Sequence, residues 1–271
     1  MTTESKGTAL ITGASSGIGA VYADRLARRG YDLIIVARNR RRLDAVAERL
    51  TNETKRSIEV LAADLTDQND LARVEDTLKK DSSLTMLVNN AGFGTFAPLL
   101  DSNVSKMSEM ISLNVTALTR LTYAAAPGFV ARGTGTIINI SSIVAIAPEL
   151  LNGVYGGAKA YVLAFSHSLQ HELASKGVRI QAVLPGVTAT EFWDVGGMPV
   201  SHLPADWVMS TEDLVDAALS GLDHGELVTI PSLADGGEWD RFETARRDMS
   251  NRLSRTEPAA RYRVKALDKA S

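Results

Sequence analysis

The chain has 271 residues, 45% of them hydrophobic and 23% charged, with a formal net charge of −3 at pH 7. These proportions are typical of a globular protein, and a single α/β domain can reach this length. The small net charge argues against a strongly basic nucleic-acid surface and against an acidic disordered chain. The sequence contains no cysteine, which excludes disulfides and thiolate metal sites and fits a reducing compartment.

The N-terminal segment, residues 1–7, is short and polar and lacks a signal-peptide pattern. No segment approaches the ~20 consecutive apolar residues that a membrane span needs. We therefore expect a soluble cytoplasmic protein with no nucleic-acid or membrane partner.

Seven short segments rich in Val, Ile and Leu are predicted to be β-strands. They lack the polar alternation of a half-exposed strand, which is typical of parallel strands buried on both faces. In chain order they are Thr8–Thr12, Asp32–Ala37, Ser57–Ala62, Thr85–Asn89, Thr136–Ser141, Arg179–Leu184 and Glu226–Ile230.

Longer segments with the amphipathic spacing of helices lie between these strands. They are Ile18–Arg29, Arg41–Glu53, Gln68–Lys80, Lys106–Arg132, Gly153–Lys176 and Thr211–Asp223. Pro127 is expected to kink the fourth helix or to end it early. The regular alternation of strand and helix predicts one doubly wound α/β domain, with a parallel sheet and helices on both of its faces.

The residues after the strands matter because ligands of open parallel sheets bind beyond the carboxyl ends of the strands. Glycine or a hydrogen-bonding side chain follows most of the predicted strands, although turns favour such residues in any protein. The first six strands are followed by residues 13–19, Arg38-Asn39, Asp64-Leu65, Asn90 to Gly92, Ser142, and Pro185-Gly186. This concentration predicts one ligand lying along the edge of the sheet.

The glycine-rich segment has the spacing Gly13-x-x-x-Gly17-x-Gly19, which differs from the commoner Gly-x-Gly-x-x-Gly. Such a loop lets the backbone approach a pyrophosphate closely at the N-terminus of the next helix. An ordinary strand-to-helix turn is the alternative. Its position after the first strand and before a helix favours nucleotide binding.

Several motifs occur in a characteristic order: Thr12 to Gly19, Asn89 to Gly92, Ser142, Tyr155 to Lys159, and Pro185-Gly186. With Asn114 and the thirteen-residue spacing from Ser142 to Tyr155, they resemble the short-chain dehydrogenase/reductase family, in its compact single-domain branch. The resemblance covers about residues 6–230. The sequence departs from the family at Ala158, where serine is usual, and in the extension after Pro231.

The expected architecture is a single-domain Rossmann-like fold with seven parallel strands in the order 3-2-1-4-5-6-7. We place the catalytic domain at residues 1–231 and a helical extension and tail of the same domain at 232–271. The predicted helix Glu238–Arg252 carries an apolar stripe that must dock on another surface. The stripe consists of Trp239, Phe242, Ala245, Met249 and Leu253. The long helices at 106–132 and 153–176 resemble those that pair across a twofold axis in the family, so a homodimer or homotetramer is expected.

Tyr155 and Lys159 are four residues apart on a predicted helix and therefore share one face. An ammonium ~4 Å from the phenol is worth about 4 kcal/mol at an effective dielectric of ~20. That interaction predicts a phenol pKa about 3 pH units below its usual value, which suits a general acid. The alternative is a surface Tyr-Lys pair. The resemblance further implies that Lys159 holds the nicotinamide ribose and that Tyr155 protonates a carbonyl oxygen as hydride reaches the carbon.

Ser142 and Asn114 are the other two catalytic candidates. The Ser142 hydroxyl can donate to a substrate oxygen where negative charge develops, although serine after a strand is usually a turn residue. Ser141 has the same chemistry, and the family's spacing to the tyrosine selects Ser142. The resemblance implies that Asn114 bends its helix and holds a water in a proton relay to Lys159. A solvent-facing asparagine is the alternative.

The expected cofactor is NADP(H). NAD-binding proteins need a carboxylate after the second strand, whereas this chain has Arg38, which can pair with a 2′-phosphate. Arg40, Arg41 and Arg42 would add to the positive field. The cofactor-binding candidates are Gly13, Ser15, Ser16, Gly17, Ile18, Gly19, Arg38, Asn39, Asp64, Leu65, Asn90, Ala91, Gly92, Tyr155, Lys159, Pro185, Gly186, Val187, Thr188 and Thr190. No metal is expected, because His167 and His171 alone are a weak metal signal.

The predicted reaction is the NADPH-dependent reduction of a ketone or aldehyde, with Tyr155 as general acid/base. Aromatic and aliphatic loop residues at the same edge favour an apolar substrate pocket, although they could be a satellite core. They are Phe93, Phe96, Leu150, Leu151, Phe192, Trp193 and Trp207. The rival hypotheses are a dehydrogenase that oxidises an alcohol with NAD and a catalytically idle NADP-binding sensor or interaction protein.

Overall fold

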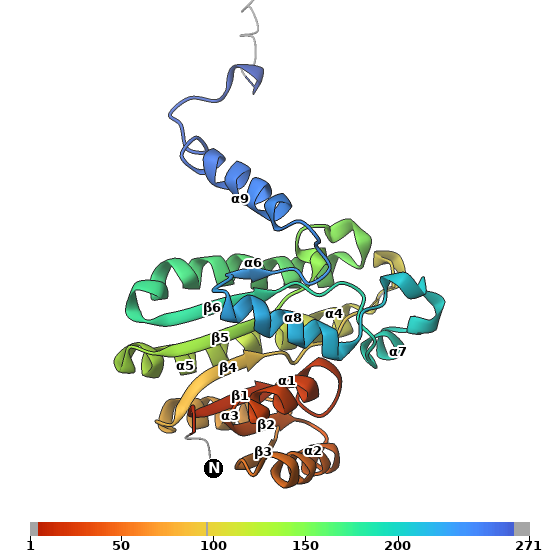
Figure 1. The fold of residues 1–271 in the computed structure, drawn as a ribbon. Helices are drawn as coiled ribbons and strands as arrows, with labels where there is room; N and C mark the ends of the chain where they lie inside the picture. The colour runs from red at the N-terminus through yellow and green to blue at the C-terminus, as the bar shows by residue number, and fades with distance from the viewer. Residues whose placement is uncertain (1–4, 96, 263–271) are drawn as a thin grey trace, which may run out of the picture. The chain divides into compact units, whose positions relative to one another are not determined.

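The computed structural model describes residues 5–95 and 97–262, with the side chains of 194 and 195 left aside. These residues belong to two compact units, Met1–Ser232 and Leu233–Ser271, which are described separately. The first unit contains the sheet and its covering helices (Figure 1). None of the described helices is both long and apolar enough to cross a membrane.

The first unit is built on a seven-stranded parallel sheet in the order β3-β2-β1-β4-β5-β6-β7, which confirms the predicted Rossmann-like fold. The strands are β1 (Thr8–Thr12), β2 (Asp32–Ala37), β3 (Ile58–Ala62), β4 (Leu84–Asn89), β5 (Gly135–Ile140), β6 (Val178–Val183) and β7 (Val228–Thr229). The last strand is shorter than predicted, because only Val228 and Thr229 pair with β6.

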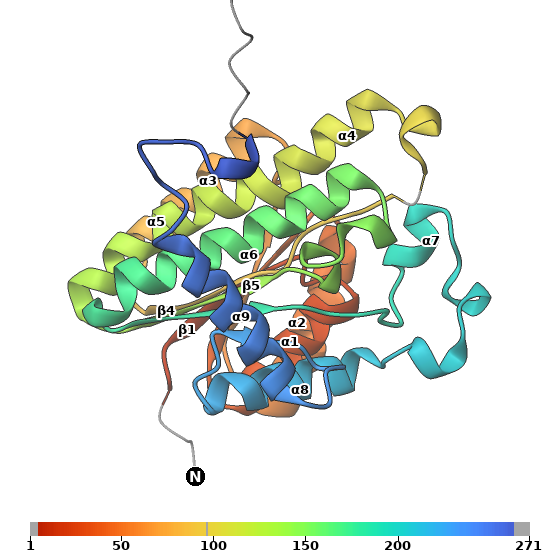
Figure 2. The ribbon, with the colours of Figure 1, turned by 90° about the horizontal axis from the view of Figure 1, so that it is seen from above.

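Helices cover both faces of the sheet, as the sequence predicted (Figure 2). The helices on one face are α1 (Gly17–Arg28), α2 (Arg40–Thr54) and α8 (Thr211–Asp223), and those on the other are α3 (Gln68–Lys80), α5 (Leu118–Arg132) and α6 (Gly153–Leu173). Alternate residues of each strand point to opposite faces of the sheet and contribute to the two cores. Ile11 and Ile35 pack on the first face, and Leu10 and Ile34 pack on the second. Burial on both faces explains why the strand sequences are continuously apolar.

The long helix predicted at Lys106–Arg132 is divided near its beginning rather than at its proline. It consists of α4 (Val104–Ile111), a π-helical segment (Ser112–Ala117) and α5. α5 runs through Pro127 to Arg132, so the expected early end was wrong. Burial of α5 side chains such as Ala125 and Phe129 against the sheet outweighs the backbone hydrogen bond that proline removes.

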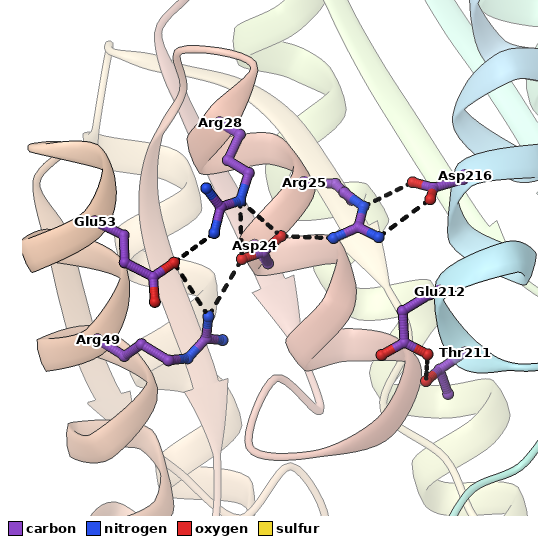
Figure 3. Close-up of polar contacts among 8 residues, drawn as sticks. All are labelled: Asp24, Arg25, Arg28, Arg49, Glu53, Thr211, Glu212 and Asp216. Atoms are coloured by element: carbon purple, nitrogen blue, oxygen red, sulfur yellow. Dashed lines mark hydrogen bonds and ion pairs between the residues drawn. The ribbon is translucent and has the colours of Figure 1, made fainter.

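α1 is fixed to its two neighbouring helices by a cluster of charges around the buried carboxylate of Asp24 (Figure 3). Arg25 and Arg28 donate to Asp24 from α1, and Arg49 donates from α2, at 2.7, 3.1 and 3.2 Å. Arg25 also pairs with Asp216 of α8 at 2.7 Å. Burial opposes ionisation of Asp24, but the three arginines outweigh it and hold the pKa of the carboxyl below its usual value. The cluster therefore fixes the helix whose N-terminus forms part of the site described below.

The second unit contains α9 (Gly236–Ser250), which lies where the apolar stripe predicted a helix. The Asp235 side chain accepts a hydrogen bond from the backbone N–H of Gly237 at 2.9 Å and begins this helix. The Trp239 and Phe242 rings contact each other on this helix, with their centroids 5.3 Å apart and their planes tilted by 30°.

Candidate active site

A cavity of about 750 Å³ opens in the first unit beyond the carboxyl ends of the strands. Segments that follow six different strands line it, as the positions of the sequence motifs predicted. The candidate site residues all line this cavity except Gly19 and Asn114, which lie immediately behind its wall.

The glycine-rich loop forms one wall and has a shape that only glycine permits. Gly13 and Gly17 have φ values of 68° and 54°, in the left-handed region. A Cβ on Gly19 would lie 2.3 Å from the carbonyl oxygen of Gly13, so Gly19 packs the loop against itself rather than lining the cavity. Ser16 is the N-cap residue of α1, but its hydroxyl makes no capping hydrogen bond. The loop therefore presents uncapped donors at the start of a helix.

Asn90 and Thr12 tie this loop to the end of β4. The Asn90 amide nitrogen donates to the carbonyl oxygens of Thr12 and Gly13 at 2.9 and 3.3 Å. In return, the Thr12 hydroxyl accepts from the backbone N–H groups of Asn90 and Ala91, both at 3.0 Å. Asn90 lines the cavity, but its side-chain donors hold the loop in place. Thr12 was not among the sequence candidates, since its role depends on a partner 78 residues away.

Arg38, Asn39 and Asp64 form the far end of the cavity, after β2 and β3. Within the described residues, Arg38 has an exposed side chain with no hydrogen bond or ion pair, and Asn39 caps α2 by accepting from the N–H of Arg42 at 3.1 Å. Burial opposes ionisation of Asp64, but hydrogen bonds from Thr66 and the charge of Arg38 hold its pKa below the usual value. An anion near Arg38 would meet a guanidinium that has no other pairing in this part of the chain.

Tyr155 lies in the first turn of α6 and is only 7% exposed. Burial raises the pKa of its phenol above the usual range, and the nearby Ser142 hydroxyl offsets this only in part. Ser142 follows β5, and its hydroxyl donates weakly to the carbonyl oxygen of Pro185 at 3.3 Å. Both candidates line the cavity.

Lys159 lies one helical turn after Tyr155, but burial outweighs this neighbouring charge, and the phenol pKa is not depressed as the spacing suggested. Its Nζ donates to the carbonyl oxygen of Ile140 at 2.9 Å and lies 5.7 Å from the centroid of the Tyr155 ring. Burial lowers the pKa of Lys159 to about 8. The expectation of a depressed phenol pKa was thus wrong for the free protein, because desolvation favours the neutral form of each group.

Asn114 lies in the π-helical segment and is 2% exposed, so the solvent-facing alternative was wrong. Its side chain accepts from the N–H of Phe93 at 3.1 Å and donates to the carbonyl of the same residue at 2.8 Å. A Cβ on Gly92 would lie 2.9 Å from Asn114 Oδ1 and 3.8 Å from Lys159 Nζ. Asn114 therefore fixes the loop after β4 close to the lysine.

The other end of the cavity is apolar, as expected from the loop residues. Phe93, Leu150, Leu151, Trp193 and Trp207 line it, with Phe192, Met198 and Leu203 from the segment after β6. The Phe192 and Tyr155 rings lie 5.6 Å apart, centroid to centroid. Gly94 makes this approach possible, since a Cβ there would lie 2.6 Å from Phe192. Phe96, also expected here, lies outside the described residues.

Met198, Leu203, Glu109 and Glu191 line the cavity but were not predicted. Two of them follow a short helix, α7 (Phe192–Gly196), which is too short to give a periodic signal. Glu109 lies on α4, one helical turn before Leu113, which also lines the cavity. Leu113 stands next to Asn114 in the sequence, and Glu109 precedes Leu113 by one helical turn. This spacing is the sequence signal that could have identified Glu109.

Comparison with known proteins agrees with this geometry. The family model for short chain dehydrogenase matches residues 7–195. A short-chain dehydrogenase from Sphingobium yanoikuyae, solved in complex with NADPH, is 48% identical, with a TM-score of 0.92 over 95% of this chain and 100% of its own. The bulky-bulky ketone specific alcohol dehydrogenase from Comamonas testosteroni is 46% identical, with a TM-score of 0.88 over 96% and 99%.

A curated relative, hydroxysteroid dehydrogenase-like protein 1 from Gallus gallus, is 31% identical over 216 residues, which make up 79% of this chain. The match spans only 65% of that relative's length. The family model covers well over half of this chain, and its matched region contains the glycine-rich loop, Ser142, Tyr155 and Lys159. The chain belongs to the short-chain dehydrogenase/reductase family.

Proposed function

We propose that the protein is an oxidoreductase that binds NADP(H) and reduces a hydrophobic ketone or aldehyde to its alcohol. The observation that carries this proposal is the position of Tyr155 and Ser142, which line one cavity between a glycine-rich loop and an apolar pocket. Similar solved structures support it, since one is a complex with NADPH and another is specific for bulky-bulky ketones.

The residues present fit a dinucleotide with a 2′-phosphate. Gly13 and Gly19 leave no room for a Cβ, and the Ser16 hydroxyl caps no backbone group. These features suit a pyrophosphate, which the uncapped N-terminus of α1 would hold. Arg38 would hold the 2′-phosphate, because it is unpaired in the described part of the chain and can bind phosphate in bidentate fashion.

The chemistry that the bound cofactor supplies is hydride donation to a carbonyl carbon. Ser142 orients the carbonyl oxygen, and its hydroxyl helps to stabilise the charge that develops there. Tyr155 donates the proton to that oxygen. Its raised pKa means that the neutral phenol, the form required for reduction, is present at any ordinary pH.

Lys159 makes this proton transfer possible although the phenol is a weak acid. With a pKa of about 8, its amine is mostly charged at neutral pH. An ammonium beside the ring stabilises the phenolate that remains after proton donation. Asn114 contributes by holding the Phe93 backbone, which fixes the loop next to the lysine.

The apolar end of the cavity favours a hydrophobic substrate. Its lining is aromatic and aliphatic around Tyr155, and small-molecule sites of this kind bury most of a ligand's apolar surface. The presence of Ser142, Tyr155 and Lys159 together argues against an idle sensor. No specific observation favours an oxidative role over a reductive one.

The test is a panel of ketones and aldehydes with NADPH, with cofactor consumption followed by absorbance. We expect turnover of aryl or bulky alkyl ketones to exceed that of small charged keto acids. Tight NADPH binding without turnover on any member of the panel would instead indicate the idle sensor. Preference for a small charged keto acid would contradict the apolar pocket.

A further inference from the structure

Glu191 forms an ion pair at the cavity for which the proposed function gives no reason. It follows β6, just before α7, and its carboxylate accepts a hydrogen bond from Arg42 Nη1 at 2.7 Å, across 149 residues of sequence. The nearby Ser16 hydroxyl also helps to hold the pKa of Glu191 below its usual value. All three residues line the cavity. One anionic side chain thus connects the segment after β6 with the start of α2, close to the glycine-rich loop.

Arg42, which pairs with Glu191, and Ser16, which lies near it, both carry hydrogen-bond donors at places where a phosphate would bind. Ser16 is the N-cap of α1, and its hydroxyl is not used for capping. Arg42 lies in the first turn of α2, four residues after Arg38. The neighbouring Thr190 packs against the same loop, because a Cβ on Gly17 would lie 3.2 Å from its methyl group.

We infer that Glu191 acts as an internal anion, which pairs with Arg42 beside Ser16 in the free protein and competes with the phosphate groups of the cofactor for these donors. Glu191 is thereby a residue that sets cofactor affinity and discriminates between NADP(H) and NAD(H). This inference rests on the proposed function, since it requires that the cavity binds a dinucleotide.

The electrostatics of the pair suit an exchangeable contact. The hydrogen bond from Arg42 holds the pKa of Glu191 below its usual value, so the carboxylate is charged at neutral pH. The side chains of Arg42 and Glu191 are 50% and 58% exposed. Exposed ion pairs contribute little to stability, so a doubly charged phosphate can displace the carboxylate at low cost. The competition should therefore change cofactor affinity by about two- to fivefold.

A matched control exists on the same helix. Arg40 and Asp44 of α2 form an ion pair at 3.1 Å with comparable exposure, 66% and 54%. Neither residue lines the cavity. Removing the Asp44 charge therefore changes the net charge of the protein as much as removing the Glu191 charge, but it frees no donor of the site.

The experiment measures dissociation constants of NADPH and NADH by fluorescence titration at low ionic strength, without a carbonyl substrate, on wild type, Glu191→Gln and Asp44→Asn. We expect Glu191→Gln to tighten NADPH binding about two- to fivefold and NADH binding less, and Asp44→Asn to change neither. Adding Arg42→Gln to Glu191→Gln should remove the gain. Because these are binding measurements, they do not depend on turnover.

Weaker binding of both cofactors by Glu191→Gln would overturn the inference, since Glu191 would then close the cleft over the cofactor. Equal tightening by Asp44→Asn would also overturn it, because the effect would come from net charge. An unchanged NADPH affinity in Glu191→Gln would show that the contact is idle. If the wild type binds neither cofactor, the proposed function itself fails.

Discussion

At the residue scale, burial determines the protonation states of the proposed catalytic pair, Tyr155 and Lys159. Tyr155 and Lys159 are both 7% exposed, and each is pushed toward its neutral form, so the phenol keeps its proton while the amine loses part of its charge near pH 8. In the proposed mechanism, Tyr155 donates a proton only while Lys159 is charged, because the phenolate needs a nearby positive charge. Reduction should therefore have an upper pH limit set by Lys159.

The phenol is expected to be required for turnover but not for cofactor binding. Tyr155→Phe keeps the ring that packs beside Phe192 and removes the proton donor. General acid catalysis is typically worth about 10²–10⁴-fold, so kcat should fall by that factor while the NADPH dissociation constant stays nearly unchanged. Steady-state kinetics and fluorescence titration measure the two quantities. Near-normal kcat in the variant would refute the assignment.

The upper pH limit is a second expected outcome. As pH rises through about 8, Lys159 loses its proton, and kcat for ketone reduction should decline. The falling limb of the kcat profile reports this group in the loaded enzyme. Lys159→Arg, which keeps a charge at all working pH values, should abolish the decline even if its activity is low. A decline that persists unchanged in that variant would assign it to another group.

Cofactor choice is expected to depend on Arg38. In Arg38→Asp, the bidentate contact to a 2′-phosphate is replaced by repulsion, and the new carboxylate can accept from a ribose hydroxyl. The NADPH kcat/KM should fall about 10- to 100-fold, and the NADH value should rise. Arg41→Asp makes the same charge change on α2 outside the cavity lining and serves as the control. Equal effects of the two variants would indicate that cofactor preference depends on the overall positive charge of this region and not on a contact made by Arg38.

At the element scale, the site depends on how α6 is held against the end of β5. The Ser141 hydroxyl donates to the backbone carbonyl of Lys159 at 2.8 Å, and the Lys159 ammonium donates to the Ile140 carbonyl at 2.9 Å. The next residue is Ser142, whose hydroxyl partly offsets the raised pKa of the Tyr155 phenol. Two residues at this strand end thus hold Lys159, and the third acts on Tyr155.

Ser141→Ala is expected to lower kcat modestly, because it removes one of these attachments without touching the reacting groups. A buried hydrogen bond contributes about 0.5–1.5 kcal/mol, which corresponds to a two- to tenfold loss. Ser141→Thr, which keeps the hydroxyl, should restore most of the activity. The pH profile separates positioning from simple destabilisation, since only a displaced Lys159 moves the falling limb. A lower melting temperature with an unchanged profile would make Ser141 merely structural.

The sequence was informative about elements wherever a pattern was long and repeated. All seven strands were predictable, because continuous Val, Ile and Leu runs follow from burial on both sheet faces, and their order followed from the expected Rossmann-like fold. The break at Ser112–Ala117 was indicated only by the resemblance, which implied a bend at Asn114; Pro127 is the stronger local signal, and tertiary packing overrides it. Likewise, the Tyr-Lys spacing predicts a shared helix face, but the pKa directions depend on burial that only the fold defines.

At the scale of the whole molecule, the second unit is the part whose role the catalytic site does not explain. The α9 helix carries the apolar stripe, and Glu243 on the same helix pairs with Arg246 and Arg247 at 2.9 and 3.4 Å. A charged helix with aromatic residues on one side gains stability by covering that side. We expect this unit to support assembly or substrate binding.

Two truncations test this expectation. A chain that ends at Pro231 should show a changed oligomeric state in sizing chromatography or a raised substrate KM, because it lacks the whole stripe. A chain that ends at Arg263, a residue outside the described part, keeps α9 and should change neither. An unchanged oligomer and unchanged kinetics in the shorter chain would show that the stripe has no such role.

The ties between Thr12 and the end of β4 also have a consequence for synthesis. The Thr12 hydroxyl bonds the carbonyl of Val88, 76 residues later in the chain, and Asn90 holds the glycine-rich loop from 78 residues away. At about 5–20 residues per second, a ribosome adds that stretch in roughly 4–15 s. During this time the loop lacks its hydrogen bonds to the end of β4. The nascent chain therefore does not yet have a complete nucleotide-binding site. Cofactor binding can therefore stabilise only the completed sheet and cannot help its first half to fold.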